Sequence, residues 1–269
     1  MFDYNRLHSI IKGYTTFFRV EMGIISAGDS DIGRKRKTNQ DSIFVDNKHH
    51  FFAVADGMGG HSGGDVASQL AVKVMPEFMA KNPSMEAQTL MRNVIFEVNR
   101  SILEKAEEEP TLHGMGTTLS AIYVSGPTLV VGNVGDSRVY MVNANKIYQM
   151  TRDHSFVQEK LNMGIYTREE AVKDPQKNVL VRSVGFEADL QVDVFNYRIC
   201  KNDIFMICSD GLHGKVSDAD ILHIIQKNIT DPSNCTLDDV KGAVKELIQQ
   251  ANDNGGQDNI SVIVAVAQA

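Results

Sequence analysis

Residues 51–64 read Phe-Phe-Ala-Val-Ala-Asp-Gly-Met-Gly-Gly-His-Ser-Gly-Gly. The first five are apolar, which predicts a buried strand, and Asp56 ends this run. The glycines after Asp56 allow the backbone to present its polar groups to an anion or to the ligand shell of a metal. A helix is predicted over residues 65–80, kinked or restarted at Pro76. The stretch therefore predicts an acidic side chain at the end of a strand, followed by a glycine-rich turn into a helix.

The rest of the chain continues this alternation of short apolar runs and helical patterns. Further strands are predicted at residues 42–45, 119–124, 129–134, 139–142, 192–194, 204–208 and 260–267. Apolar residues recur at helical spacing over 90–102 and 240–251. Because some strands come in succession and others alternate with helices, we expect an α+β fold with mainly antiparallel sheets, not a doubly wound one. No linker divides the sequence, so we expect one domain.

Five aspartates stand at the ends of apolar runs. They are Asp41, Asp56, Asp136, Asp210 and Asp258. Any one of them alone is typical of a turn or cap residue. If four of them met at spacings of about 5 Å, each pair would repel by about 3 kcal/mol at an effective dielectric constant of about 20. Such a group must protonate, spread apart or bind cations, and all-oxygen ligands favour Mg²⁺ or Mn²⁺ over zinc.

The charge and cysteine content argue against several classes of protein. The 269 residues include 27 Lys+Arg and 34 Asp+Glu, a net charge of −7, whereas a nucleic-acid-binding protein is expected to carry a basic excess. The 3 cysteines have no C-x-x-C spacing, which argues against a disulfide framework and a zinc site. No apolar run approaches the ~20 residues of a membrane-spanning helix, and the N-terminus does not resemble a secretory signal, so we expect a cytoplasmic protein.

A basic run, Arg34-Lys-Arg-Lys37, comes just before Asn39-Gln40-Asp41. Such a run is usually a solvated face. Beside a candidate metal ligand it also suits an arginine that binds a phosphate group through two hydrogen bonds.

Three other chemistries that handle phosphate lack support. No Gly-Lys-Ser/Thr ends the glycine-rich loop, so it is not a Walker A loop. A phosphatase with a cysteine nucleophile needs Arg six positions after the cysteine, but Met206, Gly214 and Lys241 stand there. Asp29-Ser-Asp31 resembles the start of an aspartyl-phosphate motif, but Gly33 occupies the place of Thr or Val.

The N-terminal segment carries a separate signal. Within residues 1–22, Leu7, Ile10, Ile11, Tyr14, Phe17 and Phe18 recur at helical spacing. We expect an amphipathic helix that packs on its own domain. A helix that docks on a partner or a membrane surface, and a strand extension, are the alternatives.

Six segments together resemble the motifs of the metal-dependent protein phosphatase 2C family in its bacterial form. In order they are Ser-Asp-Ile-Gly-Arg-Lys-Arg-Lys-Thr-Asn-Gln-Asp (30–41), Ala-Asp-Gly-Met-Gly-Gly-His (55–61), Gly-Met-Gly-Thr-Thr (114–118), Gly-Asn-Val-Gly-Asp-Ser-Arg (132–138), Ser-Asp-Gly-Leu (209–212) and Gly-Gly-Gln-Asp-Asn (255–259). The resemblance covers about residues 24–267. It therefore implies a catalytic domain over 23–269 and leaves 1–22 as an N-terminal extension.

The family resemblance implies a four-layer α-β-β-α sandwich with two mainly antiparallel sheets. It also implies two Mn²⁺ or Mg²⁺ ions in a cleft at one edge and a third, weaker site. Asp56 is similar to the acid that bridges both metals, with the Gly57 carbonyl on one of them. Asp210 and Asp258 resemble ligands of the other metal, and Asp136 resembles the ligand of the third metal. Asp41 resembles the acid that acts through metal-bound water. Arg36 resembles the arginine that binds the phosphate.

Three positions depart from the family pattern. Gln40 stands where many relatives have glutamate, and Gly214 where some have another acid for the third metal. Met58 occupies the place of the histidine proposed as general acid in animal members, so His61, three residues later, becomes the candidate acid here. A structural or substrate-contact role is the alternative for His61. We expect His113, His154 and His213 to be surface or satisfied histidines.

The activity that the resemblance implies is hydrolysis of phosphoserine and phosphothreonine in proteins, by in-line attack of a hydroxide bridging two ions. Residues 153–182 look like the family's mobile flap, with a rigid helical insertion as the alternative. A phosphoprotein-binding regulatory module and a small-molecule phosphomonoesterase are the alternative functions. We expect a monomer whose partners are phosphorylated proteins, either substrates of a Ser/Thr kinase or the kinase itself.

Overall fold

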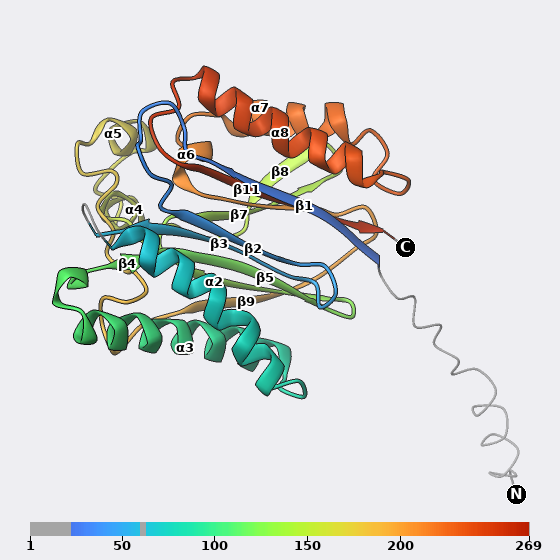
Figure 1. Ribbon diagram of the computed structural model, residues 1–269. Helices are drawn as coiled ribbons and strands as arrows, with labels where there is room; N and C mark the ends of the chain where they lie inside the picture. Colours follow the sequence, from blue (N-terminus) through green and yellow to red (C-terminus); the bar gives the residue numbers. More distant parts are fainter. Residues whose placement is uncertain (1–22, 60–62, 269) are drawn as a thin grey trace, which may run out of the picture.

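Two antiparallel β-sheets lie face to face, and helices cover the outer face of each (Figure 1). The computed structural model describes residues 23–59 and 63–268. One sheet has the order β1 (Gly23–Asp31), β11 (Ile260–Gln268), β10 (Ile204–Cys208), β7 (Arg138–Asn143) and β8 (Lys146–Gln149). The other has the order β2 (Asp41–Asp46), β3 (Phe51–Met58), β5 (Leu119–Ser125), β6 (Thr128–Val134) and β9 (Asp193–Arg198), with β4 (Gly116–Thr117) paired to β3. The expected four-layer α+β sandwich is confirmed.

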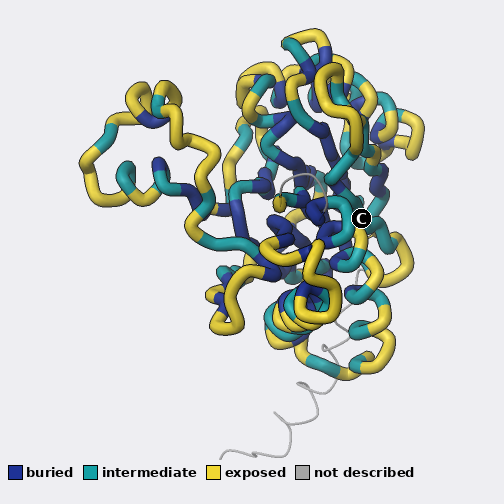
Figure 2. The backbone as a smooth tube through the Cα atoms, turned by 60° about the vertical axis from the view of Figure 1, so that its left-hand side comes forward, coloured by how far each residue is buried: buried dark blue, intermediate teal, exposed yellow. Residues whose placement is uncertain are grey.

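The central strands are buried on both faces, which is why they appear in the sequence as continuous apolar runs. In β3, Phe52 and Val54 pack between the sheets with residues such as Phe205. Phe51, one position earlier, packs on the opposite face with the helices. Figure 2 shows that buried residues follow the sheets and that exposed residues gather in the surrounding segments. A fully buried phenylalanine contributes about 1.5–3 kcal/mol to stability, so this alternation fixes which face of β3 meets which layer.

The long helices form the two outer layers. α2 (Gly64–Lys81) and α3 (Ala87–Glu108) cover the sheet that contains β3, and a short 3₁₀ turn, η1 (Pro110–Leu112), follows them. α7 (Asp218–Asn228) and α8 (Leu237–Asp253) cover the sheet that contains β11 (Figure 1). The helical patterns at 90–102 and 240–251 are confirmed, because their apolar residues are the buried faces of α3 and α8.

The helix after the glycine-rich loop continues through Pro76, so the predicted restart does not occur. α2 is one helix with Pro76 inside it. A proline removes one backbone donor and disfavours the turn before it. Ala67, Ala71 and Met75 lie on the same buried face and pack into the core, and this tertiary packing offsets the local cost.

The edge strand β1 was not predicted from the sequence. It reads Gly-Ile-Ile-Ser-Ala-Gly-Asp-Ser-Asp, which has no long apolar run, yet all 9 residues pair with β11. An edge strand is covered less completely than a central one, and only Ser26 and Ala27 of β1 are buried. Pairing with β11, rather than its own pattern, therefore makes this segment a strand.

Residues 153–182 contain two short helices, α4 (Phe156–Asn162) and α5 (Arg168–Lys173). The Lys160 ammonium lies 4.2 Å from the centre of the Phe156 ring and 4.4 Å from that of Tyr166. It also donates a hydrogen bond to the Tyr166 hydroxyl at 2.9 Å. These contacts tie α4 to Tyr166, which lies in the connection between the two helices. The role of the segment as a flap stays a prediction.

Two expectations fall outside the described residues. The amphipathic helix within residues 1–22 is one of them, and the candidate acid His61 is the other. The division into an extension over 1–22 and a catalytic domain over 23–269 stays a prediction. Across the part of the chain that the structure describes, no helix combines the length and the apolar character needed to cross a membrane.

Candidate active site

The strand ends bring the five aspartates to one edge of the sandwich. Antiparallel pairing places the start of β2, the end of β3 and the end of β6 together, and Asp41 lies directly opposite Asp56. Asp136 follows β6 after one glycine. In the other sheet, the end of β10 lies beside the start of β11. Asp210, the first residue of the short helix α6 (Asp210–His213), and Asp258 flank these two strand ends.

A cavity of about 860 Å³ opens at this edge. Asp56, Gly57, Asp136, Asp210 and Asp258 line it together with Arg36. A second cavity of about 760 Å³ is lined by Asp136, Asp210 and Asp258 as well, so these three residues are reachable from both. Asp41 differs from the others, because it is only 7% exposed and does not line either cavity. The structure therefore brings all the predicted site residues that it describes to one place, with Asp41 behind the cavity wall.

Burial, together with repulsion between neighbouring carboxylates, raises the pKa of four aspartates at this edge, which are Asp41, Asp56, Asp136 and Asp210. The pKa of Asp56 is raised well above its usual range by desolvation and by the nearby Asp41 and Asp210. Burial, with repulsion from Asp210 and Asp153, raises the pKa of Asp136 to about 8. Burial raises the pKa of Asp41 to about 6 and that of Asp210 also to about 6. Without a cation, the site therefore retains protons that isolated aspartates would lose.

The ligand set fits hydrated divalent cations. Asp41 Oδ2 accepts a hydrogen bond from Ser209 at 2.8 Å, but Asp41 Oδ1 is buried with no hydrogen-bond partner. A buried carboxylate oxygen in this state is costly unless a proton or a cation neutralises it. Within residues 23–59 and 63–268, no three His, Cys, Asp or Glu side chains come together tightly enough to enclose an ion unaided. Mg²⁺ keeps several waters and uses one or two carboxylates, and Mn²⁺ also favours carboxylate and water, so looser spacing suits both ions.

Arg36 is the member of the basic run that lines the cavity. Its Nη2 donates a hydrogen bond to Asp258 Oδ2 at 2.7 Å, and its side chain is 49% exposed. The guanidinium has five N–H donors, so others remain for a phosphate group. Arg34, Lys35 and Lys37 do not line the cavity, and the solvated-face interpretation suits these three.

Gly57 allows β3 to run against two other backbone segments. A Cβ atom at this position would lie 2.0 Å from the carbonyl oxygen of Gly64 and 2.6 Å from that of Gln40. No side chain fits at such distances. The Gly57 N–H donates a hydrogen bond to the Gln40 carbonyl at 3.1 Å. Glycine here therefore brings the start of α2 and the loop before β2 next to the strand end that carries Asp56.

The histidines near the motifs have structural contacts. His154 is buried, its Nδ1 accepts a hydrogen bond from the Gly135 N–H at 3.1 Å, and its Nε2 lies 3.3 Å from Asp193 Oδ2. His213 Nε2 lies 3.0 Å from the Asp136 carbonyl oxygen. Burial lowers the pKa of His154, and it lowers that of His213 to about 3. His113 is exposed. Among the described residues, no histidine lines the cavity that contains Arg36.

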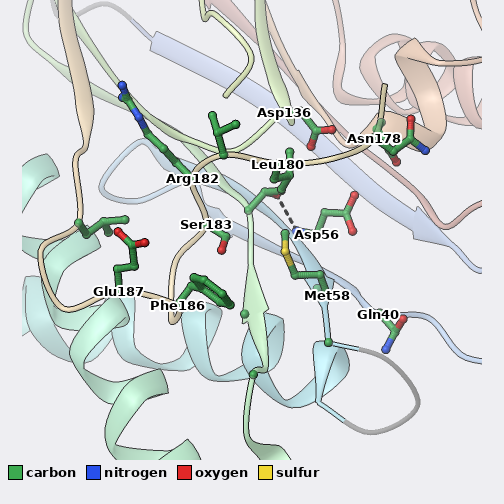
Figure 3. Close-up of a pocket in the computed structure, with 18 of the residues that line it drawn as sticks. Gln40, Asp56, Met58, Asp136, Asn178, Leu180, Arg182, Ser183, Phe186 and Glu187 are labelled. Carbon is green, nitrogen blue, oxygen red and sulfur yellow. Dashed lines mark hydrogen bonds between the residues drawn. The ribbon is translucent and has the colours of Figure 1, made fainter. Parts of the chain in front are cut away.

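Residues 178–191 form one wall of the cavity; residues 178–182 belong to the expected flap, but the rest of the wall was not predicted from the sequence. Figure 3 shows Arg182, Phe186 and Glu187 of this wall on the side away from Gln40. Val184 pairs with Thr117 in an isolated bridge, and Asn99 of α3 donates a hydrogen bond to the Glu187 carbonyl at 2.9 Å. These contacts join segments that are distant in the sequence, and no motif or periodicity marks them in advance.

In the absence of divalent ions, we expect the free energy of unfolding to fall as the pH rises from 7 to 8. Asp56 and Asp136 hold protons in the native state that the unfolded chain, with aspartate pKa values of about 3.9, has lost. Each extra native proton lowers the free energy of unfolding by about 1.4 kcal/mol per pH unit. A change of about 1 kcal/mol corresponds to a Tm shift of roughly 2–4 °C in a domain of this size.

Thermal unfolding in EDTA at pH 7 and pH 8 measures this fall. The lowered pKa values of His154 and His213 act in the opposite sense, but that effect is largely complete above a pH of about 7, since an unfolded histidine titrates near 6.5. Asp136→Asn is expected to reduce the fall in Tm. An equal fall in the variant would show that Asp136 does not carry the extra proton.

The sequence is similar to a known protein family and to characterised phosphatases. The family model described as "Protein phosphatase 2C" matches residues 27–261. The serine/threonine phosphatase stp of Listeria monocytogenes serovar 1/2a is 39% identical over 242 residues, which cover 87% of this chain and 92% of that protein. The serine/threonine protein phosphatase PstP of Mycobacterium tuberculosis is 35% identical over 248 residues, covering 92% of this chain and 46% of that longer protein.

Solved structures show the same similarity. The crystal structure of the Mycobacterium tuberculosis serine/threonine phosphatase PstP/Ppp superposes with a TM-score of 0.82 at 34% identity, covering 91% of this chain and 99% of that one. A structure of the PstP catalytic domain in complex with two manganese ions gives a TM-score of 0.81 at 32% identity, covering 92% of this chain and 100% of that one.

Proposed function

Because the chain belongs to the protein phosphatase 2C family and is a serine/threonine phosphatase, we propose that it hydrolyses phosphoserine and phosphothreonine in proteins with two Mn²⁺ or Mg²⁺ ions at the carboxylate cavity. The observation that carries this proposal is that Asp56, Asp136 and Asp210, drawn from both sheets, line one cavity together with Arg36. Desolvation and mutual repulsion raise the pKa of all three, which is the state that bound cations would relieve. The relative solved with two manganese ions supports the choice of cofactor.

The aspartates of the cavity would hold the ions. Asp56 would be shared by the two ions, and the Gly57 carbonyl would bind one of them. Asp210 and Asp258 would bind the other ion. Asp136 would belong to a third, weaker site. Asp41, behind the wall, would act through a water molecule. When bound, divalent ions would supply Lewis acidity, which would lower the pKa of a water molecule so that it can lose a proton near neutral pH, and would offset the charge of the phosphate.

Side chains of the protein itself would orient the phosphate group and assist its transfer to water. Arg36 at the cavity would donate hydrogen bonds to phosphate oxygens, and its ion pair with Asp258 holds the guanidinium beside the carboxylates. With the attacking water in line, the serine or threonine oxygen leaves with a proton and no covalent phosphoenzyme forms. His61 remains the proposed donor of that proton, and it lies outside the described residues.

Arg36→Ala is expected to raise KM for a phosphothreonine peptide about 10- to 150-fold, with a smaller change in kcat, because a charge-assisted hydrogen bond contributes about 1.5–3 kcal/mol. Steady-state kinetics with saturating Mn²⁺ measure both constants. Lys35→Ala is the matched control, since Lys35 is an exposed neighbour that does not line the cavity. An unchanged KM in Arg36→Ala would favour the solvated-face interpretation.

Phosphate release from phosphoserine and phosphothreonine peptides tests the proposed function. A higher kcat/KM for phosphorylated metabolites than for peptides would instead support a small-molecule phosphomonoesterase. Tight phosphopeptide binding without turnover would support a regulatory binding module. The presence of Asp56, Asp210 and Asp258 together at one cavity favours the enzyme over that module.

We propose that the partners of this protein are phosphoproteins, either targets of a Ser/Thr kinase or the kinase itself. We also propose that the chain acts as a cytoplasmic monomer.

A further inference from the structure

Asn259 is a buried amide that contacts the loop carrying Arg36. It follows Asp258 directly in the sequence and is 4% exposed. Its Oδ1 accepts a hydrogen bond from the Gln40 N–H at 2.9 Å. Its Nδ2 donates to the carbonyl oxygens of Ile32 at 3.0 Å and Thr38 at 3.1 Å. One side chain therefore contacts both ends of residues 32–40, the connection between β1 and β2.

The same loop lies on the turn that precedes β11. The Arg34 N–H donates to the Gly256 carbonyl at 2.7 Å. At Gly33, where φ is +80°, a Cβ atom would lie 2.2 Å from the Asp258 carbonyl oxygen, so the two backbones approach as closely as glycine allows. The side-chain hydrogen bonds of Asn259 add to these backbone contacts between residues 32–40 and the turn before β11.

We propose that Asn259 is the positioning residue for Arg36: it fixes residues 32–40 on the 256–259 turn, so that the Arg36 guanidinium and the Asp258 carboxylate are held together. This inference rests on the proposed function of Arg36 as the phosphate-binding residue. The Arg36 side chain is 49% exposed and long, so its own packing restrains it little. Holding the loop ends reduces the freedom that phosphate binding would otherwise have to remove.

The bond pattern requires asparagine. The planar amide offers an acceptor oxygen and a nitrogen with two donor hydrogens, which match one N–H group and two carbonyl groups. Aspartate has nearly the same shape, but it only accepts, so it would keep the bond from Gln40 and place a carboxylate oxygen against the carbonyls of Ile32 and Thr38. Asn259→Asp therefore loosens the loop with minimal change in volume.

Kinetics of Asn259→Asp in two backgrounds test the inference. We expect the variant to raise KM for a phosphothreonine peptide about tenfold with less than about a threefold change in kcat. In an Arg36→Ala background the same substitution is expected to change KM less than about twofold, because residues that act as a unit are not additive. Asn259→Ser, a milder change, serves if the aspartate variant does not fold.

Asn252→Leu is the matched control. Asn252 is also a buried amide, 6% exposed, and its Nδ2 donates to Asp31 Oδ1 at 3.0 Å, at the root of the same loop but outside residues 32–40. We expect it to lower Tm and leave KM unchanged. An increase in KM on Asn259→Asp that is equally large without Arg36, or no increase at all, would overturn the inference.

Binding of inorganic phosphate, measured by calorimetry in the presence of Mn²⁺, separates this inference from the proposed function. If the wild-type protein binds phosphate but does not turn over phosphopeptides, the proposed function fails. Weaker phosphate binding in both Arg36→Ala and Asn259→Asp, but not in Asn252→Leu, would still support the positioning role. Phosphate binding that is weakened by Arg36→Ala and unaffected by Asn259→Asp contradicts it.

Discussion

Asp56→Asn is expected to remove phosphatase activity and, in EDTA, to make the protein more stable. We expect kcat/KM for a phosphothreonine peptide to fall at least about 10³-fold, since metal ions supply several kcal/mol of transition-state stabilisation and each 1.36 kcal/mol is tenfold in rate. The metal-free native state carries a penalty at this position, because desolvation and the neighbouring aspartates raise the pKa of Asp56 well above its usual range. Asparagine has no charge to desolvate, so the variant avoids that penalty.

The opposite signs of the two effects make the test specific. A loss of activity through misfolding would be accompanied by a lower Tm, whereas loss of a metal ligand is accompanied by a higher Tm in EDTA and a smaller stabilisation by Mn²⁺. The gain in Tm is expected to be larger at pH 8 than at pH 6, because the proton that wild-type Asp56 must retain is harder to hold at higher pH.

Asp29→Asn is the matched control. Asp29 lies on β1, its Oδ1 accepts a hydrogen bond from the Ser30 N–H, and it does not line the cavity. We expect normal activity from this variant. Because Asp29-Ser-Asp31 resembles the start of an aspartyl-phosphate motif, the control also tests that alternative chemistry. Activity that survives in Asp56→Asn would refute the metal assignment.

The strand ends were predictable because buried strands leave a clear signal. Phe51–Met58 and Ile204–Cys208 are apolar on both faces, so both strands and the aspartates that follow their apolar residues could be located from the sequence. The meeting of Asp41 with Asp56 depends on strand register, which no single segment specifies. The resemblance to a family supplied that step, and the pairing of β2 with β3 shows how the chain achieves it.

Other parts of the site depend on contacts between distant residues. Arg182 and Glu187 reach the cavity because Val184 pairs with Thr117, a partner more than sixty positions earlier. Asn259 belongs to the Gly-Gly-Gln-Asp-Asn segment (255–259), but its hydrogen bonds to Ile32 and Thr38 form only when the fold brings residues 32–40 against it. A continuous α2 through Pro76 likewise reflects packing that outweighs a local preference. Local patterns therefore predicted the central strands, the helices α2, α3 and α8 and the acids, while the edge strand β1, the cavity wall and the contacts of Asn259 required the fold.

Removal of divalent ions is expected to stop phosphate release, and restoration by Mn²⁺ is expected to require less metal at higher pH. Ligand carboxylates must be deprotonated to bind a metal, so binding releases protons. Asp136 has its pKa raised to about 8, and the pKa of Asp56 is also raised, so both still hold protons at pH 6.5 in the metal-free protein. Each displaced proton makes the apparent affinity rise by up to about tenfold per pH unit below the pKa of the group.

Activity on a phosphothreonine peptide, titrated with Mn²⁺ at pH 6.5 and pH 8 after treatment with EDTA, measures this shift. We expect the half-saturating Mn²⁺ concentration to be at least about tenfold lower at pH 8, as one displaced proton requires over most of this range. In Asp136→Asn the shift should shrink, because one of the titrating groups is gone while Asp56 remains. The thermal stabilisation by Mn²⁺ should follow the same pH dependence, since a ligand that binds only the native state raises stability according to its concentration relative to Kd. Full activity in EDTA, or a half-saturating concentration that does not change with pH, would mean that these buried carboxyl groups do not bind the ions on which catalysis depends.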